Sequence, residues 1–201
     1  MKRALNVLLI GLVFQKLTQL SQILVQAAVE DGVPVTAVQQ DFITTCINPA
    51  RHYLRFGVSD CGARIEPGEV DVLLGVDLYE AARIGADYLA DSGVLIVNSR
   101  VVPRPIDGKW GRLAPELQEK LLGLLRSIAS KVIVLDAVEL ADRAGDAELI
   151  RFAMLGALCG SGVLPLQVET VEKVLSETVM ELEREAAVKA FRAALQQVRT
   201  A

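Results

Sequence analysis

The sequence predicts an α/β fold of three layers, in which helices cover both faces of a mostly parallel, mixed, Rossmann-like sheet. The first observation is the apolar run 7–10, whose lack of alternation is typical of a strand buried on both faces. The second is that strand-like and helix-like segments alternate up to about residue 145. From Asp146 onward the pattern is helical only. We therefore expect a single domain over residues 1–201, with an α/β sheet core in 1–145 and a C-terminal helical part in 146–201.

Composition narrows the classes of function. The 201 residues are 52% hydrophobic, which is enough to bury a sizeable core. The formal net charge is -4, and no basic stripe is interleaved with aromatic residues, which argues against nucleic acid as a partner. The apolar run after Met1, Lys2 and Arg3 is too short for a signal peptide, and no stretch reaches membrane-spanning length. We therefore expect a cytoplasmic protein that contacts no membrane.

The first half of the chain contains one clear helix and several strands. The expected strands cover residues 5–10, 33–38, 51–58 and 70–76, with a long loop over 39–50. The first helix follows Gly11, and its predicted buried stripe is Leu17, Leu20, Leu24, Ala27 and Ala28. No crossover helix precedes the strand at 51–58, so we expect that strand to run antiparallel to one neighbour.

The second half adds two strands and a series of helices. We expect strands at 94–97 and 131–135, and helices at 78–89, 115–129, 137–144, 147–158, 168–180 and 181–198. The predicted buried stripe of the helix at 115–129 is Leu117, Leu121, Leu124 and Leu125. For the last helix it is Leu182, Ala186, Ala190, Ala193 and Ala194, a face that would dock on the domain or on a partner subunit.

The turn after the first strand has the position of a nucleotide-binding loop but not its composition. Such loops carry several glycines, because phosphate oxygens must approach bare backbone N–H groups at the start of the helix. Here only Gly11 remains, and Val13, Phe14 and Lys16 carry side chains. We interpret Lys16 as a solvated helical lysine in preference to an anion ligand. The turn is thus predicted to keep the geometry of a ligand loop without its phosphate chemistry.

Three polar residues end predicted strands. Asp77, Asn98 and Asp136 would therefore lie along the carboxyl edge of the sheet, where open α/β folds bind ligands. The alternative is that these side chains cap helices or close turns, as Asp and Asn commonly do. Both interpretations remain open from the residues alone.

Neither the single histidine nor the cysteines predict a catalytic or metal centre. His52 shares a strand face with Leu54, Phe56 and Val58, and no Ser, Cys or acidic partner can be placed beside it from sequence. We therefore expect His52 to be structural. The three cysteines are far apart and form no Cys-x-x-Cys pair, which argues against a disulfide framework, a metal site or an iron–sulfur cluster. They are Cys46, Cys61 and Cys159.

The order of several short motifs resembles a known family. These are Leu-Leu-Ile-Gly followed by Gln15, Glu-Val-Asp-Val-Leu-Leu-Gly-Val-Asp at 69–77, Gly-Val-Leu-Ile-Val-Asn-Ser-Arg at 93–100 and Val-Ile-Val-Leu-Asp-Ala-Val-Glu-Leu-Ala from Val132. Met-Leu-Gly-Ala-Leu before Leu-Pro-Leu completes the set. Together they resemble the gamma-type subunits of 2-oxoacid:ferredoxin oxidoreductases, a family that includes pyruvate, ketoisovalerate and indolepyruvate enzymes. The pattern is most similar to the small (beta) subunits of the indolepyruvate type.

The resemblance implies a role inside a hetero-oligomer that oxidatively decarboxylates a 2-oxoacid to acyl-coenzyme A and reduces ferredoxin. It implies that thiamine diphosphate and the iron–sulfur clusters belong to partner subunits, and that the gamma-type part supports assembly and helps enclose coenzyme A. On this interpretation the chain binds no cofactor alone and meets ferredoxin only through the complex. An isolated chain could form a homodimer.

The sequence departs from the family pattern in two loops. Val13, Phe14 and Lys16 replace three glycines of the first loop, and Cys46, Ile47 and Asn48 stand where the family has Arg-Gly-Gly. From the first loop the resemblance therefore carries over only Gly11 and Gln15.

With the three strand-end residues, the candidate cofactor-binding set is Gly11, Gln15, Asp77, Asn98 and Asp136. No catalytic residue and no metal ligand is assigned. Two alternatives remain: a diverged assembly or regulatory module that keeps the fold but has lost the ligand loops, and a stand-alone nucleotide-binding enzyme.

Overall fold

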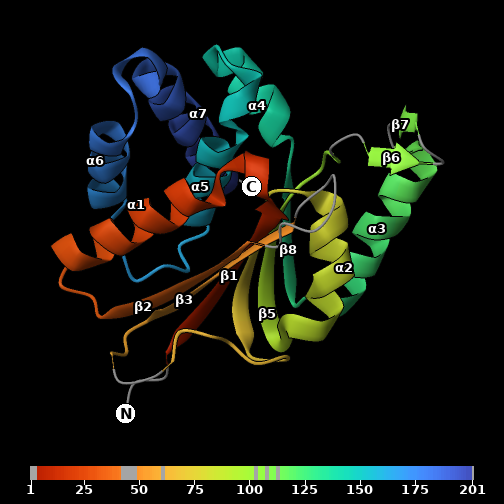
Figure 1. Cartoon of the computed structure of the whole chain (residues 1–201), viewed down its shortest axis with the longest axis horizontal. Helices are drawn as coiled ribbons and strands as arrows, with labels where there is room; N and C mark the ends of the chain where they lie inside the picture. Colours follow the sequence, from red (N-terminus) through yellow and green to blue (C-terminus); the bar gives the residue numbers. More distant parts are fainter. Residues whose placement is uncertain are drawn as a thin grey trace.

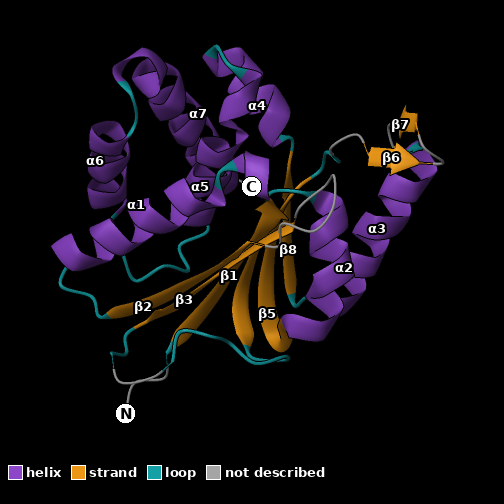
Figure 2. Cartoon of the chain, viewed as in Figure 1, coloured by secondary structure: helices purple, strands orange, loops and turns teal. Residues whose placement is uncertain are grey.

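A computed structural model describes residues 4–41, 49–59, 62–101, 104–106, 109–111 and 114–200, with the side chains of 104–106 and 109–111 left out. A six-stranded sheet lies between two layers of helices (Figures 1 and 2). Its strands are β1 (Leu5–Leu12), β2 (Val35–Asp41), β3 (Pro49–Phe56), β4 (Val70–Gly75), β5 (Leu89–Asn98) and β8 (Lys131–Leu135). The helices are α1 (Leu17–Glu30), α2 (Leu78–Tyr88), α3 (Pro115–Ile128), α4 (Ala137–Ala144), α5 (Ile150–Gly160), α6 (Val168–Thr178) and α7 (Glu181–Arg199). The three-layer prediction is confirmed.

The strand order is β2-β3-β1-β4-β5-β8. The strands β1, β4, β5 and β8 are parallel, and β3 runs antiparallel to both of its neighbours, β1 and β2. The prediction of a mixed sheet is therefore confirmed, and the predicted antiparallel pairing of this strand is found with β1 and also with β2. The strand β3 lies between β2 and β1, and these two strands run in the same direction, opposite to β3.

The element boundaries differ from the predicted ones in strands and in loops, and β5 begins at Leu89, five residues before the predicted strand at 94–97. The predicted loop at 39–50 is shorter, since β2 continues to Asp41 and β3 begins at Pro49; residues 42–48 lie outside the described part. The stretch before α3 contains a small antiparallel pair, β6 (Arg104–Ile106) and β7 (Lys109–Gly111), that periodicity did not predict. A 3-10 turn, η2 (Ala147–Leu149), precedes α5, and Asp146 caps it by accepting from the Glu148 N–H at 2.8 Å.

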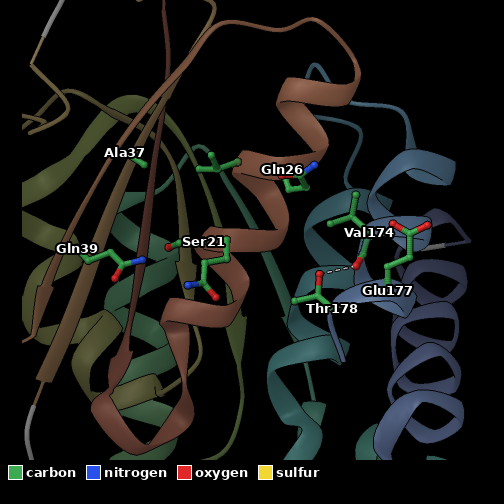
Figure 3. A pocket seen from close by; sticks show the side chains of 9 residues that line it. Ser21, Gln26, Ala37, Gln39, Val174, Glu177 and Thr178 are labelled. Atoms are coloured by element: carbon green, nitrogen blue, oxygen red, sulfur yellow. Dashed lines mark hydrogen bonds between the residues drawn. The ribbon is translucent and has the colours of Figure 1, made fainter. Parts of the chain in front are cut away.

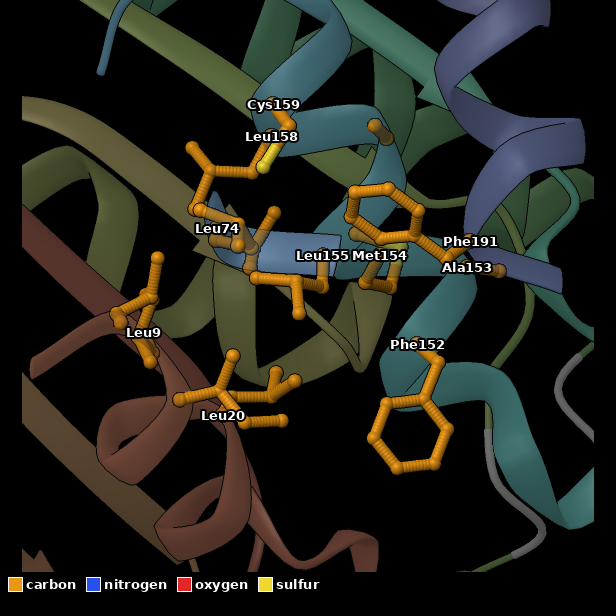
Figure 4. Packing of buried hydrophobic residues seen from close by; sticks show 14 of the residues in the cluster. Leu9, Leu20, Leu74, Phe152, Ala153, Met154, Leu155, Leu158, Cys159 and Phe191 are labelled. Atoms are coloured by element: carbon orange, nitrogen blue, oxygen red, sulfur yellow. The ribbon is translucent and has the colours of Figure 1, made fainter. Parts of the chain in front are cut away.

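The larger hydrophobic core lies on the face of the sheet covered by α1, α5 and the later helices. Leu9 and Leu74 of the sheet meet Leu20 of α1 and Leu155 of α5 there (Figure 4). The predicted stripe of α1 is buried in full. Residues before and after 145 thus share one core.

The second core lies on the opposite face, under α2 and α3, where Leu122 and Leu125 are the buried residues of α3. The predicted α3 stripe is wrong for Leu117 and Leu124, which are 38% and 45% exposed. The predicted α7 face is wrong for Leu182, which is 97% exposed, and for Ala193, which is also exposed, whereas Phe191 is fully buried. Among the helices in the described ranges, none combines the length and apolarity that a membrane crossing requires.

Candidate functional site at the carboxyl edge of the sheet

The turn after β1 is closed by the side chain of Gln15. The chain leaves β1 in a short 3-10 turn, η1 (Val13–Gln15), and Lys16 takes a left-handed conformation with φ 55° before α1 begins. The buried Gln15 side chain folds back so that its Oε1 accepts from the Leu12 N–H at 2.8 Å. Its Nε2 approaches the carbonyl oxygen of Val76 at 3.5 Å. The Gln15 side chain therefore occupies the Leu12 N–H, a type of backbone donor that a phosphate-binding loop leaves free for its ligand.

Gly11 is required by this arrangement. A Cβ at Gly11 would lie 2.6 Å from Gln15 Oε1, closer than a carbon atom that forms no hydrogen bond approaches an oxygen. Gly11 has an extended backbone in β1, so the glycine is needed for space and not for a positive φ. The one glycine left in the turn thus makes room for Gln15.

Asn98 joins three segments at the ends of the parallel strands. Its Nδ2 donates to the Val76 carbonyl at 3.2 Å, and its Oδ1 accepts from the N–H of Ala137 at 3.1 Å. The same Oδ1 accepts from the Arg100 N–H at 3.4 Å. The Val76 carbonyl therefore receives the side chains of both Gln15 and Asn98.

The two aspartates cap helices. Asp77 is fully buried and accepts from the Glu80 N–H at 3.0 Å at the start of α2. Asp136 accepts from the Glu139 N–H at 3.0 Å at the start of α4, and from Nε of Arg100 at 2.8 Å. Burial raises the pKa of Asp136, but the bonds from Arg100 and Glu139 outweigh it and hold that pKa below its usual value.

Sequence reasoning missed Glu148 and Arg151, two charged residues that line a pocket of about 400 Å³ beside the first turn. Phe14, Gln15 and Lys16 line it from one side, and Val138, Ala147, Glu148, Ile150 and Arg151 line the other. Phe14 is 60% exposed. A sequence signal was available, since Arg151 is the one charged residue in the otherwise apolar stretch 150–160, a composition typical of a buried helix.

Arg151 is buried against its neighbours. It donates to Gln19 Oε1 at 2.8 Å and to the Glu148 carbonyl at 3.1 Å, and it pairs with Glu183 at 3.3 Å. Burial lowers the pKa of its guanidinium, and the nearby carboxylates oppose that shift. Arg151 thus ties α5 to α1 and α7 at the floor of the pocket.

His52 has the partners that sequence could not place. Its Nδ1 lies 2.8 Å from the Ser21 hydroxyl on α1, and its Nε2 lies 3.1 Å from Oδ1 of Asp41 at the end of β2. Ser21 and His52 are both buried, and Ser21 lies inside a helix. Burial lowers the pKa of His52, and Asp41 opposes that shift. The hydrogen bonds between Ser21, His52 and Asp41 therefore connect α1 to β3 and β2.

The described residues offer no donor set for a metal. They include no group of three or more His, Cys, Asp or Glu side chains that could hold an ion. Burial raises the pKa of the Cys159 thiol to about 12, so the thiol stays protonated. Cys46 and Cys61 lie outside the described residues.

These features define the class of protein: an α/β domain of Rossmann type whose carboxyl edge is closed by its own side chains. Residues 15–197 match the family described as Pyruvate ferredoxin/flavodoxin oxidoreductase. The chain belongs to this family and is a subunit of the 2-oxoacid:ferredoxin oxidoreductase type.

A relative and two solved structures show the same likeness. The chain is 28% identical over 176 residues to indolepyruvate oxidoreductase subunit IorB of Archaeoglobus fulgidus, a match that covers 87% of this chain and 86% of the relative. The pyruvate oxidoreductase subunit PORC of Thermotoga maritima superposes with a TM-score of 0.68 and 24% identity, over 97% of both chains. A 2-oxoglutarate:ferredoxin oxidoreductase of Magnetococcus marinus superposes with a TM-score of 0.66 and 14% identity, over all of this chain and 32% of the other.

Proposed function

We propose that this chain is the gamma-type subunit of a cytoplasmic hetero-oligomer that oxidises an arylpyruvate of the indolepyruvate class to its acyl-coenzyme A and passes the electrons to ferredoxin. The single observation that carries this proposal is the family match over residues 15–197. The name of the Archaeoglobus relative supports the substrate class. The long Magnetococcus chain supports the assembly, since a domain of this fold there forms about a third of a larger protein.

The residues of this chain support a structural part in the reaction. A [4Fe–4S] or [2Fe–2S] cluster takes four thiolates, and the whole sequence has three cysteines. We therefore place the iron–sulfur clusters in partner subunits, and the resemblance to the gamma-type subunits supports the same placement for thiamine diphosphate. Gln15, Asp77, Asn98 and Asp136 then act as positioning residues that hold the carboxyl edge in shape.

The first turn does not fit a phosphate group of coenzyme A. The Leu12 N–H already donates to Gln15, and the Lys16 N–H donates to the Val13 carbonyl at 3.1 Å. A phosphate at this turn would have to displace the buried Gln15 side chain, at the cost of a buried hydrogen bond. We therefore assign no coenzyme A contact and no chemical step to the turn.

Purification from the native cells tests the proposal. We expect the affinity-tagged chain to retain partner subunits that contain thiamine diphosphate and iron, and the preparation to reduce a viologen dye when given indolepyruvate and coenzyme A. Recovery of the chain alone, together with unchanged dye reduction in cells that lack it, would contradict the proposal and favour a diverged module outside the reaction.

A further inference from the structure

The strand β2 leaves one edge of the sheet open. It lies at the end of the strand order, and no strand in the described part of the chain pairs with its outer side. Its register with β3 runs from Val35 to Asp41 without a bulge. The strand is uncharged from residue 35 to 40 and contains neither lysine nor proline. It therefore lacks the features with which proteins usually protect an edge strand.

The pairing pattern identifies which backbone groups face outward. The Gly57 N–H donates to the Pro34 carbonyl at 2.7 Å, which makes these two residues a hydrogen-bonded pair at the start of the ladder. Hydrogen-bonded and non-hydrogen-bonded pairs alternate in an antiparallel ladder, so the even-numbered residues of β2 bond to β3. The N–H and C=O groups of Ala37 and Gln39 therefore point away from β3, toward the open edge.

A groove of about 580 Å³ lies beside the same residues (Figure 3). The side chains of Ala37 and Gln39 face it from β2, those of Val25 and Gln26 from α1, and those of Val174 and Glu177 from α6. Side chains alternate across a sheet, so every second residue of an added strand would face this groove. The helices α1 and α6 would then cover those side chains.

The lining sets the chemistry of an occupant. Glu177 is the one charged side chain among the residues that line the groove, and it forms no ion pair within the described residues. The nearby Lys173 forms its ion pair with Glu30, at 2.9 Å, and acts on Glu177 only through a longer-range charge interaction. The remaining lining is of amide, hydroxyl and aliphatic side chains. An occupant with one cationic side chain, flanked by small uncharged side chains, would therefore complement the surface of the groove.

A second copy of this chain does not suit the groove. Two copies that pair β2 with β2 antiparallel are related by a two-fold axis perpendicular to the sheet, which keeps the helices of both on the same face. Both copies of α1 and α6 would then compete for the space above the joined strands. A strand that brings no helix of its own avoids this conflict.

We propose that the open edge of β2 binds an extended segment of a partner polypeptide, which adds a strand to the sheet and places a Lys or Arg side chain against Glu177. Strand addition of this kind draws affinity from backbone hydrogen bonds and specificity from the pockets that take alternate side chains. The existence of a partner subunit rests on the proposed function; the docking surface and the chemistry of the segment go beyond it.

Amide hydrogen exchange, measured on the intact complex and on the isolated chain, tests the inference. We expect exchange in the peptide that covers residues 35–41 to slow by at least about tenfold in the complex, because the outward amides gain partners. Unchanged exchange in an intact complex would overturn the inference while leaving the proposed function in place. Slowing that requires only a concentrated solution of the isolated chain would also overturn it, since the occupant would then be a second copy.

Two variants sharpen the test. Ala37→Pro removes an outward N–H without breaking a bond to β3, and Glu177→Arg reverses the charge in the groove. We expect each to weaken binding of the partner by about tenfold or more, which corresponds to about 1.4 kcal/mol. Glu169→Arg is the matched control, because it makes the same change on the exposed first turn of α6 outside the groove. Full-strength binding by the Glu177→Arg variant, with an unchanged melting temperature, would count against the cationic contact.

Discussion

At the scale of single residues, the carboxyl edge is a network of side-chain bonds to backbone groups. Gln15 and Asn98 converge on the Val76 carbonyl, while Asp77 and Asp136 cap α2 and α4. The sequence could place Asp77, Asn98 and Asp136 at one edge, because each follows a predicted strand, whereas only the family resemblance points to Gln15. It could not decide between ligand binding and capping, because the partner amides are fixed only by the fold. The structure shows that Asp77 and Asp136 cap helices, and a cofactor-binding role for these residues stays a proposal.

A Gly11→Ala substitution tests the packing of the first turn. We expect it to lower the free energy of unfolding by about 1–3 kcal/mol, because the new Cβ displaces the buried Gln15 amide and leaves the Leu12 N–H without its acceptor. In a Gln15→Ala background the same substitution should cost much less, since the colliding atom is gone. Urea denaturation of the four proteins measures the cycle, and strictly additive losses would contradict the account.

His52 predicts a pH dependence of stability. Burial depresses its pKa below the ordinary value of 6.5 in the folded state, so below that pH the unfolded chain binds more protons than the folded chain. The stability that His52 provides is therefore present above pH 6.5 and is lost as the pH falls through its folded pKa. Unfolding free energies of the wild type and a His52→Gln variant should differ most at pH 8 and converge toward pH 5. A difference that grows on acidification would show that the folded pKa is raised.

At the scale of elements, helix existence was easier to predict than helix orientation. Periodicity identified α3 and α7, but Leu117, Leu124 and Leu182 are exposed. A helix rich in apolar residues offers more than one possible stripe, and only tertiary packing selects among them. In α7 the buried stripe is selected by the contact with α5, because Gly156 and Gly160 of α5 leave room for the α7 backbone. Sequence spacing alone does not reveal such a contact.

The contact between α5 and α7 should tolerate no added methyl group. A Cβ at Gly156 would lie 2.0 Å from the carbonyl oxygen of Phe191, and this oxygen belongs to backbone that cannot rotate away. We expect Gly156→Ala to cost about 3 kcal/mol or more, because the helices must separate. Gly123→Ala is the control: its Cβ meets nothing within 4 Å, so better helix propensity should stabilise the chain by up to about 1 kcal/mol. A neutral result for Gly156→Ala in thermal unfolding would contradict this packing.

At the scale of the whole molecule, the helical part and the sheet share one core. Phe152, Leu155 and Phe191 pack in the same cluster as Leu9 and Leu74. We therefore propose that residues 1–201 form a single domain and that the sheet core at 1–145 cannot fold without 146–201. A chain that ends at Gly145 should lose its cooperative unfolding transition by circular dichroism. Retention of a sharp transition would show two separable units.

The architecture was predictable from the sequence because buried strands and amphipathic helices alternate along it. The pairing of β3 with two neighbours was not, since strand order depends on contacts between segments far apart in the chain. The triple contact of Ser21, His52 and Asp41 escaped prediction for the same reason. Local sequence patterns predict the helices and strands, whereas the side-chain contacts of a site form between elements that are far apart in the chain.

Reconstitution tests the central claim most directly. The partner subunits, purified from cells that lack this chain, would be assayed for indolepyruvate- and coenzyme A-dependent reduction of ferredoxin, with and without the purified chain added in equal amount. The account predicts that activity requires the chain and saturates at a fixed ratio of chain to partner. Full activity of the partners alone, with no change on addition, would contradict it.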